Sequence, residues 1–128
     1  MVEARRIPPL SPFEEETGFT RAVRVGDRIL VSGMTAVMPD GSIPAAAGAQ
    51  ADRCFEQIIA YIEELGGRAG DVVRVRMFVT DIADANAISA SFSRALRHAR
   101  PTGTLVAVAA LYRPEWKVEI EAEAVVAM

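Results

Sequence analysis

The sequence predicts an α+β fold in which two helices pack on one face of a single sheet. Two observations lead to it. Five segments have the composition or the polar–apolar alternation of β-strands, and two have apolar residues at the three- and four-residue spacing of an amphipathic helix. These segments follow one another in the order ββαβαββ, which is typical of helices packed against one sheet. Residues 1–128 are expected to form one domain.

The first two strands are expected to form a hairpin. They follow an N-terminal arm interrupted by prolines and comprise residues 19–25 (FTRAVRV) and 28–37 (RILVSGMTAV). The Gly26-Asp27 pair between them predicts a tight turn. A second turn is predicted at residues 39–41, Pro-Asp-Gly, and a short additional strand near Ala36 is an alternative assignment.

Two helices alternate with the third strand. Between Gly48 and Leu65 one helical stripe carries the apolar residues Ala51, Cys54, Phe55, Ile58, Ile59, Ile62 and Leu65. Gly66-Gly67 predicts the end of this helix, and residues 71–81 (DVVRVRMFVTD) read as a strand. Asp84 is a candidate cap for a second helix, whose inner face would carry Ile88, Phe92, Ala95 and Leu96 and which Pro101 would end.

The last two strands are residues 104–111 (TLVAVAAL) and 116–126, joined by a turn around Pro114. The first of them is apolar almost throughout, as expected for a strand buried on both faces. Because two helices cover only one face of a sheet, a second copy of the chain is expected to cover the other. A barrel that closes on itself is the alternative.

Composition excludes several classes of function. The net charge is −3 and the basic residues are dispersed, which argues against a nucleic-acid surface. No segment has the length and apolarity of a membrane span, and a single cysteine, Cys54, fits a reducing compartment, so a cytoplasmic protein is predicted. One histidine, His98, and one cysteine cannot build a conventional metal site, and no phosphate-binding loop is present, so no cofactor is expected.

The last strand carries an acid at every second position: Glu119, Glu121 and Glu123. Alternate side chains of a strand point to the same face, so the three carboxylates share one side of the sheet. Such a row is usually a solvated face, and a role in chemistry needs a further reason.

Five segments follow one known pattern in order: G-F-T-R-A-V (18–23), the S-G that ends the second strand (32–33), D-V-V-R-V-R-M-F-V-T-D (71–81), P-T-G-T (101–104) and V-E-I-E (118–121). Together they resemble the RidA/YjgF family, also described as endoribonuclease L-PSP-like. Its best-known members hydrolyse reactive enamines and imines to keto acids and ammonia. The resemblance implies a chorismate-mutase-like fold with one mixed sheet, and a homotrimer with ligand pockets in the clefts between subunits.

The resemblance also implies a set of pocket residues. Phe19 stands where the family usually has a tyrosine, so the ring is kept and the hydroxyl is lost. Ser32 and Gly33 match the serine-glycine beside the pocket, and Ser89 stands where the family has an asparagine. Glu119 matches the acid that opens the V-E-I-E motif, where it would act as a general acid–base.

The sequence departs from the family at Thr102, Gly103 and Thr104. Deaminating members have P-A-R there, and their arginine binds the substrate's carboxylate; this chain has Gly103 at that position. A guanidinium is a bidentate, permanently charged partner for a carboxylate, so its absence predicts poor binding of 2-imino acids. Arg21 and Arg76 are candidates to replace it, although either could be an outward-pointing charge of the sheet.

Two functions remain open. The first is a small-molecule hydrolase or deaminase acting on an imine, enamine or related amide, with Glu119 activating water and Ser32 and Ser89 positioning the ligand. The second is a non-catalytic trimer that binds a metabolite or a partner protein. The retained Glu119 and Ser32 favour the first function, and the missing arginine and tyrosine hydroxyl favour the second.

Overall fold

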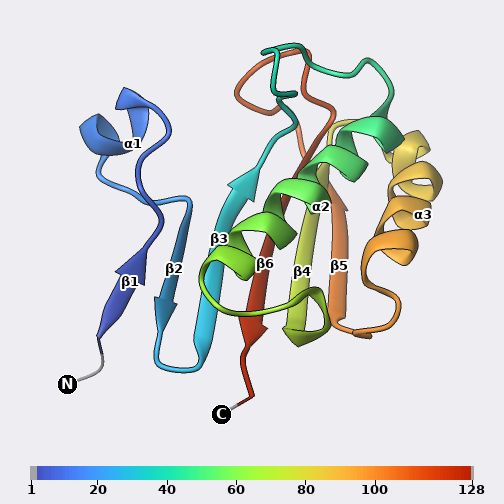
Figure 1. Ribbon diagram of the computed structural model, residues 1–128. Coiled ribbons are helices and arrows are strands. Elements are labelled where there is room, and N and C mark those ends of the chain that lie inside the picture. Colours follow the sequence, from blue (N-terminus) through green and yellow to red (C-terminus); the bar gives the residue numbers. More distant parts are fainter. Residues whose placement is uncertain (1–2, 128) are drawn as a thin grey trace.

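The computed structural model describes residues 3–127, which form one six-stranded mixed sheet with two long helices on one face (Figure 1). The strands are β1 (Ala4–Arg6), β2 (Ala22–Val25), β3 (Arg28–Met34), β4 (Val72–Val79), β5 (Thr102–Ala107) and β6 (Val118–Val125). Their order across the sheet is β1-β2-β3-β6-β4-β5, and only β4 and β5 are parallel. The predicted α+β fold is confirmed.

The helices are α1 (Pro12–Thr17), α2 (Ala47–Glu64) and α3 (Ala85–Leu96), with 3-10 turns η1 (Ala69–Asp71) and η2 (Ile82–Asp84). The chain leaves α2 through Gly66, whose φ of 90° is easily adopted only by glycine. Asp84 precedes α3 as predicted, but its side chain makes no capping hydrogen bond. The carboxylate of Asp81 instead accepts from Ala83 N and caps η2.

The hydrophobic core lies between the sheet and the α2–α3 layer (Figure 1). Its largest buried side chains are Phe55, Ile29, Met34, Ile58, Ile62, Ile88, Leu96 and Ile120. On β6 the apolar residues alternate with the glutamates and are buried against α2, so the three carboxylates lie on the face without helices. No helix within residues 3–127 is long and apolar enough to cross a bilayer.

The N-terminal arm contains two elements that the sequence pattern does not predict. Strand β1 pairs with β2 and forms one edge of the sheet, with Arg5 opposite Arg24. Helix α1 is short and stands beside the sheet rather than on it (Figure 1). It follows a run of prolines, and its few residues provide no repeat that a periodicity argument could detect.

The strand at the other edge differs from expectation. β5 spans Thr102–Ala107 instead of residues 104–111, and most of its residues are exposed. The prediction that this segment is buried on both faces is therefore wrong for the single chain. β5 is an edge strand bonded only to β4 among the described strands.

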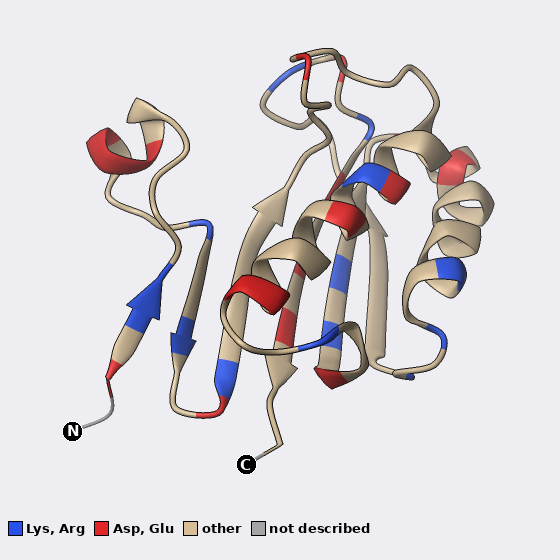
Figure 2. Cartoon of the chain, in the orientation of Figure 1, with Lys and Arg blue, Asp and Glu red and all other residues tan. Residues whose placement is uncertain are grey.

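Two of the β6 glutamates form ion pairs on the face without helices. Glu121 lies 3.3 Å from Arg76, and Glu123 lies 3.0 Å from Arg28. The register places Arg76 opposite Glu121 on the neighbouring strand, so acidic β6 lies beside basic β4 (Figure 2). Glu121 and Glu123 therefore belong to the polar face of the sheet, as the alternating pattern suggests.

Candidate functional site

A cavity of about 370 Å³ lies where β3 ends and β6 begins. It also borders α1, the residues before β2 and the β5–β6 loop, and its volume is in the range of small-molecule sites. It is lined by Phe13, Phe19, Arg21, Ser32, Gly33, Met34, Thr35, Tyr112, Arg113, Trp116 and Glu119. Five residues proposed from the sequence are among them.

A β-bulge shapes the floor of the cavity. Val31 pairs with Ala122 and Met34 pairs with Ile120, so two residues of β3, Ser32 and Gly33, oppose a single residue of β6. Such a bulge bends the strand and redirects its side chains. A Cβ atom on Gly33 would overlap the Oε2 atom of Glu119 and lie 2.9 Å from its Cδ atom. Gly33 therefore leaves the space that the Glu119 carboxyl group occupies.

Glu119 differs from the other two glutamates of its strand. It is half-buried, and within residues 3–127 it forms no ion pair. Burial, and secondarily the charge of Glu121, raises the pKa of the Glu119 carboxyl group above its ordinary value. A carboxyl group with a raised pKa in a cavity can both take up and release a proton closer to neutral pH.

Arg21 is held from behind by a buried acid. Its Nε atom donates to Glu14 Oε1 at 2.5 Å, and Glu14 on α1 is only 2% exposed. Glu14 also accepts from Leu10 N at 3.1 Å and from Ser11 Oγ at 3.4 Å. Burial alone would raise the pKa of Glu14, but the hydrogen bonds from Arg21, Leu10 and Ser11 outweigh it and the pKa is lowered. Glu14 therefore stays ionised and fixes Arg21 at the cavity.

Ser32 stabilises the segment that carries Phe19 and Arg21. Its hydroxyl donates to the carbonyl oxygen of Thr20 at 2.7 Å, and its backbone N–H donates to the carbonyl oxygen of Arg21 at 2.8 Å. The hydroxyl proton is thus engaged within the chain, while the oxygen retains acceptor capacity. In this structure Ser32 acts on the cavity by positioning its wall.

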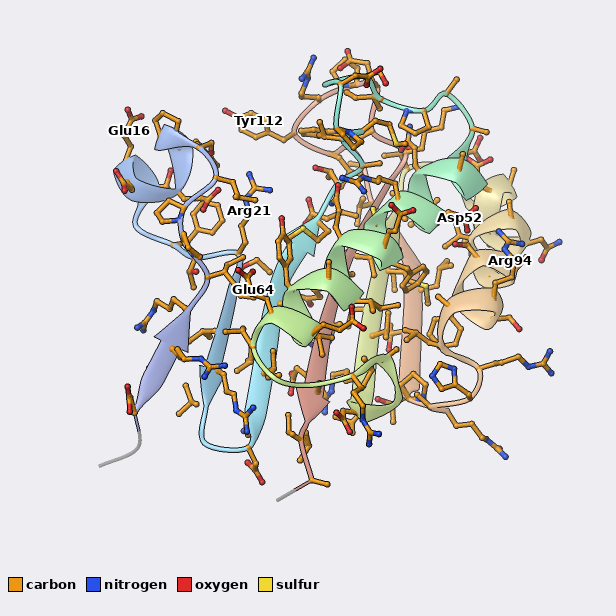
Figure 3. The ribbon with its side chains drawn as sticks, in the orientation of Figure 1. Glu16, Arg21, Asp52, Glu64, Arg94 and Tyr112 are labelled. Atoms are coloured by element: carbon orange, nitrogen blue, oxygen red, sulfur yellow. The ribbon has the colours of Figure 1, made fainter. Side chains whose placement is uncertain are left out.

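Aromatic rings form the outer wall. Phe13 on α1 makes an edge-to-face contact with Phe19, with ring centroids 5.7 Å apart, and lies 6.1 Å from the ring of Tyr112. Trp116 donates its indole N–H to Ala36 O at 3.1 Å, and Arg113 lies over the Trp116 ring. Figure 3 shows Tyr112 on the side of the β5–β6 loop that faces α1.

Four residues that line the cavity were not predicted from the sequence: Phe13, Tyr112, Arg113 and Trp116. The aromatic residues on either side of Pro114 were the one feature of the sequence that could have indicated this loop. What brings this loop to the cavity is Gln50, a fully buried amide on α2. It donates to the carbonyl oxygens of Pro44 and Glu115 and accepts from the N–H of Lys117. No local pattern reveals such a distant contact.

Five other residues proposed from the sequence lie outside this cavity. Ser89 is exposed on α3, and Thr102, Gly103 and Thr104 lie on the edge strand β5. Arg76 is paired with Glu121 and borders a separate, smaller hollow. Within one chain the candidate residues thus form a cavity group around Glu119 and an edge group on β5 and α3, while Arg76 on β4 belongs to neither.

Cys54 does not add a nucleophile. Its thiol is buried and donates to Met34 O at 3.2 Å. Burial, and secondarily the charge of Glu119, raises the pKa of the thiol to about 12, so it stays protonated. Among the residues that the structure describes, no three His, Cys, Asp or Glu side chains are grouped to bind a metal ion.

Three comparisons with known proteins find similarity to one family. The family model described as Endoribonuclease L-PSP matches residues 10–126. A RutC family protein of Haemophilus influenzae is 36% identical over 112 residues, which cover 84% of this chain and 85% of that protein. The 2-iminobutanoate/2-iminopropanoate deaminase of Escherichia coli is 32% identical over 111 residues, covering 84% and 86% of the two chains. The crystal structure of a YjgF/YER057c/UK114 family member from Mycobacterium tuberculosis has a TM-score of 0.89 and 32% identity, and the match covers 97% of this chain and 100% of that one.

Proposed function

The chain belongs to the endoribonuclease L-PSP family, the family of the RidA/YjgF proteins, and from this premise we propose that it is a hydrolase that deaminates a small imine, enamine or related amide beside Glu119. The observation that carries the proposal is the state of the Glu119 carboxyl group. It faces a cavity of ligand size, has a raised pKa, and belongs to no ion pair within residues 3–127. Its relative in Escherichia coli is named as an imine deaminase.

The chemistry requires one group that moves protons in both directions. Water adds to the carbon of the protonated imine while the Glu119 carboxylate accepts a proton from it, giving a neutral carbinolamine. The protonated Glu119 then donates this proton to the nitrogen and the C–N bond breaks; ammonia leaves as the carbonyl forms, and the Glu119 carboxylate accepts the hydroxyl proton. The raised pKa of Glu119 supports both steps, because the two protonation states then lie closer in free energy near neutral pH.

In the proposed assembly three chains complete three sites. The exposed edge strand β5 and α3 of one subunit cover the cavity of its neighbour, so Ser89, Thr102, Gly103 and Thr104 join Glu119 across the interface. The exposure of both faces of β5 supports this arrangement, as does the resemblance to a trimeric family. It accounts for the separation of the candidate residues into two groups within one chain.

The assembly predicts a stable homotrimer in solution. Sedimentation equilibrium at micromolar concentration is expected to give three times the mass of the chain. A stable monomer would contradict the proposal that β5 needs an external cover. A dimer would retain that cover but contradict the three-fold arrangement.

A second function, ligand or partner binding without catalysis, is favoured by two specific residues. Gly103 has no side chain where deaminating relatives have an arginine, and Phe19 has no hydroxyl where they have a tyrosine. Both losses fall on groups that would hold a small, charged 2-imino acid. The two functions are separated by whether any imine is hydrolysed faster with the protein than without it.

Turnover of imines made in situ from amino acids tests the proposal. We expect little acceleration of keto-acid release for the small aliphatic imines of serine, threonine and leucine, because Gly103 stands where deaminating relatives bind the carboxylate with an arginine. Gly103→Arg should raise these rates, and its Cβ atom would make an ordinary contact with Phe92 at 3.8 Å. Gly103→Gln is the matched control, adding length without charge. Failure to accelerate any aliphatic or aromatic imine would favour the binding function.

A further inference from the structure

We propose that Arg21 is the carboxylate-binding group of this cavity and that its ligand is a carboxylic acid with an aromatic side group. This assignment deepens the proposed function and rests on it in one respect. The ligand is taken to be an imino or oxo acid because these are the substrate and product of the proposed deaminase. The carboxylate clamp would then be moved from position 103, at the edge of the sheet, to a residue of the cavity group. Only the binding part is needed for the test below.

The two candidate arginines border different hollows. Arg21 lines the cavity that contains Glu119, whereas Arg76 is paired with Glu121 beside a different hollow. Arg21 remains 31% exposed at its side chain, so a ligand can reach it. Its contact with Glu14 uses Nε, and the edge formed by Nη1 and Nη2 retains the geometry that binds a carboxylate through two parallel hydrogen bonds.

Arg21 is already held in place before a ligand arrives. Glu14 is buried, accepts hydrogen bonds from Leu10, Ser11 and Arg21, and has a lowered pKa. A long side chain normally loses conformational freedom when it binds a ligand, and fixing it beforehand reduces that loss. Figure 3 shows Arg21 between α1 and the central strands, on the same side of the molecule as Tyr112.

The rest of the ligand would meet aromatic rings. Phe13, Phe19, Tyr112 and Trp116 all border the cavity, and three of them make ring contacts with one another. Phe13 and Phe19 are large apolar side chains that remain exposed, and Tyr112 is 84% exposed. Rings placed this way favour an aromatic guest through offset and edge-to-face contacts. A small aliphatic acid would leave much of this wall in contact with water.

Arg21 and the aromatic rings would hold the two ends of one ligand. A ligand whose carboxylate meets Arg21 and whose ring meets the aromatic wall would carry its reacting carbon between them, in the cavity that Glu119 also lines. The imine of an aromatic amino acid, and the 2-oxo acid formed from it, have this order of groups. Phe19 then contributes contact area, and its missing hydroxyl costs nothing to an aromatic guest.

Calorimetric titration of the full chain tests the assignment without requiring turnover. The probes are phenylpyruvate, 2-oxobutanoate, which lacks the ring, and benzyl methyl ketone, which lacks the carboxylate. Phenylpyruvate should bind at least about tenfold more tightly than either, since each comparison removes one set of contacts. Arg21→Gln should weaken phenylpyruvate binding by about 10- to 100-fold and leave the ketone unchanged. Arg28→Gln removes an exposed ion pair away from the cavity and is the matched control.

Arg21→Lys is a second variant in case Arg21→Gln fails to fold. It keeps a positive charge for Glu14 but has no planar edge, so phenylpyruvate affinity should fall to an intermediate value. Equal binding of phenylpyruvate by the wild type and folded Arg21 variants would overturn the assignment, as would a loss in Arg76→Gln instead. Equal affinity for 2-oxobutanoate would overturn the aromatic part.

The outcome also separates this inference from the proposed function. Tight, Arg21-dependent binding of phenylpyruvate without hydrolysis of any imine would retain the inference and reject the enzyme. Clear hydrolysis of aliphatic imines by a protein that does not bind phenylpyruvate would retain the enzyme and reject the inference.

Discussion

Glu119→Gln is expected to lower turnover of the accepted imine by about 10²–10⁴-fold, the usual contribution of general acid–base catalysis. Glutamine keeps the shape of the side chain and its hydrogen-bonding capacity, but it cannot transfer a proton. Glu119 makes no ion pair within residues 3–127, so no partner is left without its charge. Steady-state kinetics on the aromatic imine with the highest turnover measure the loss of activity. The thermal unfolding temperature measures whether the fold is retained.

The raised pKa of Glu119 also predicts the direction in which stability changes with pH. Because the pKa of Glu119 is raised in the folded chain, the folded state binds this proton more tightly than the unfolded state does. Its contribution to the free energy of unfolding is therefore fully present below the unfolded pKa and is lost as pH rises through the raised folded value. The glutamine variant lacks this loss, so its unfolding temperature should equal or exceed that of the wild type at neutral pH.

Two variants on the same strand are the controls. Glu123→Gln changes an ion pair away from the cavity and should leave turnover unchanged. Glu121→Gln removes the second cause of the raised Glu119 pKa, so the pKa should fall and the acid limb of the pH–rate profile should move to lower pH. If the three glutamine variants have the same activity and the same pH profile, Glu119 is part of a solvated row and the binding function is the better one.

The core elements could be predicted from sequence because their patterns are local. On β6 polar and apolar residues alternate, and on α2 apolar residues recur once per helical turn. Each pattern repeats at a fixed spacing along the sequence, and the apolar residues of both elements form part of the core. The cavity could be predicted only in part. The sequence has three consecutive acids in α1, and which of them is buried depends on Arg21, seven residues later. No composition rule specifies that choice.

Two further features depend on long-range contacts. The bulge at Ser32-Gly33 is visible only once β3 is paired with β6, and the aromatic loop reaches the cavity because Gln50 binds it from α2. The expectation for residues 104–111 was wrong for a related reason. An apolar strand indicates that cover is needed, but composition does not say whether the cover comes from the same chain.

Gly33→Ala is expected to lower turnover by about 10²-fold without removing any catalytic group. The new methyl group would overlap Oε2 of Glu119 and lie 2.9 Å from its Cδ and 3.1 Å from its Cγ, so the carboxyl group has to move. A displacement of about 1 Å in a reacting group can cost a factor of this size.

Stability should respond in the opposite way. Gly33 is outside the positive-φ region, so alanine fits its backbone without strain. The atoms that the methyl group meets belong to the end of a flexible side chain rather than to the backbone. Replacing glycine with alanine at a compatible position restricts the unfolded chain and stabilises the fold by about 0.4–1 kcal/mol. The unfolding temperature should therefore be unchanged or raised while activity falls.

Two comparisons show whether Gly33 acts through Glu119. Gly48→Ala is the matched control, because the atoms nearest to a Cβ there belong to Ala87, the first of them at 3.5 Å, on α3 and away from the cavity. The double variant of Gly33→Ala and Glu119→Gln should be no less active than Glu119→Gln alone, since both changes act on one carboxyl group and their effects do not add. Full activity in Gly33→Ala would mean that Glu119 works equally well from another position. A further loss in the double variant would mean that Gly33 serves the ligand directly, through the space that it leaves beside the bulge.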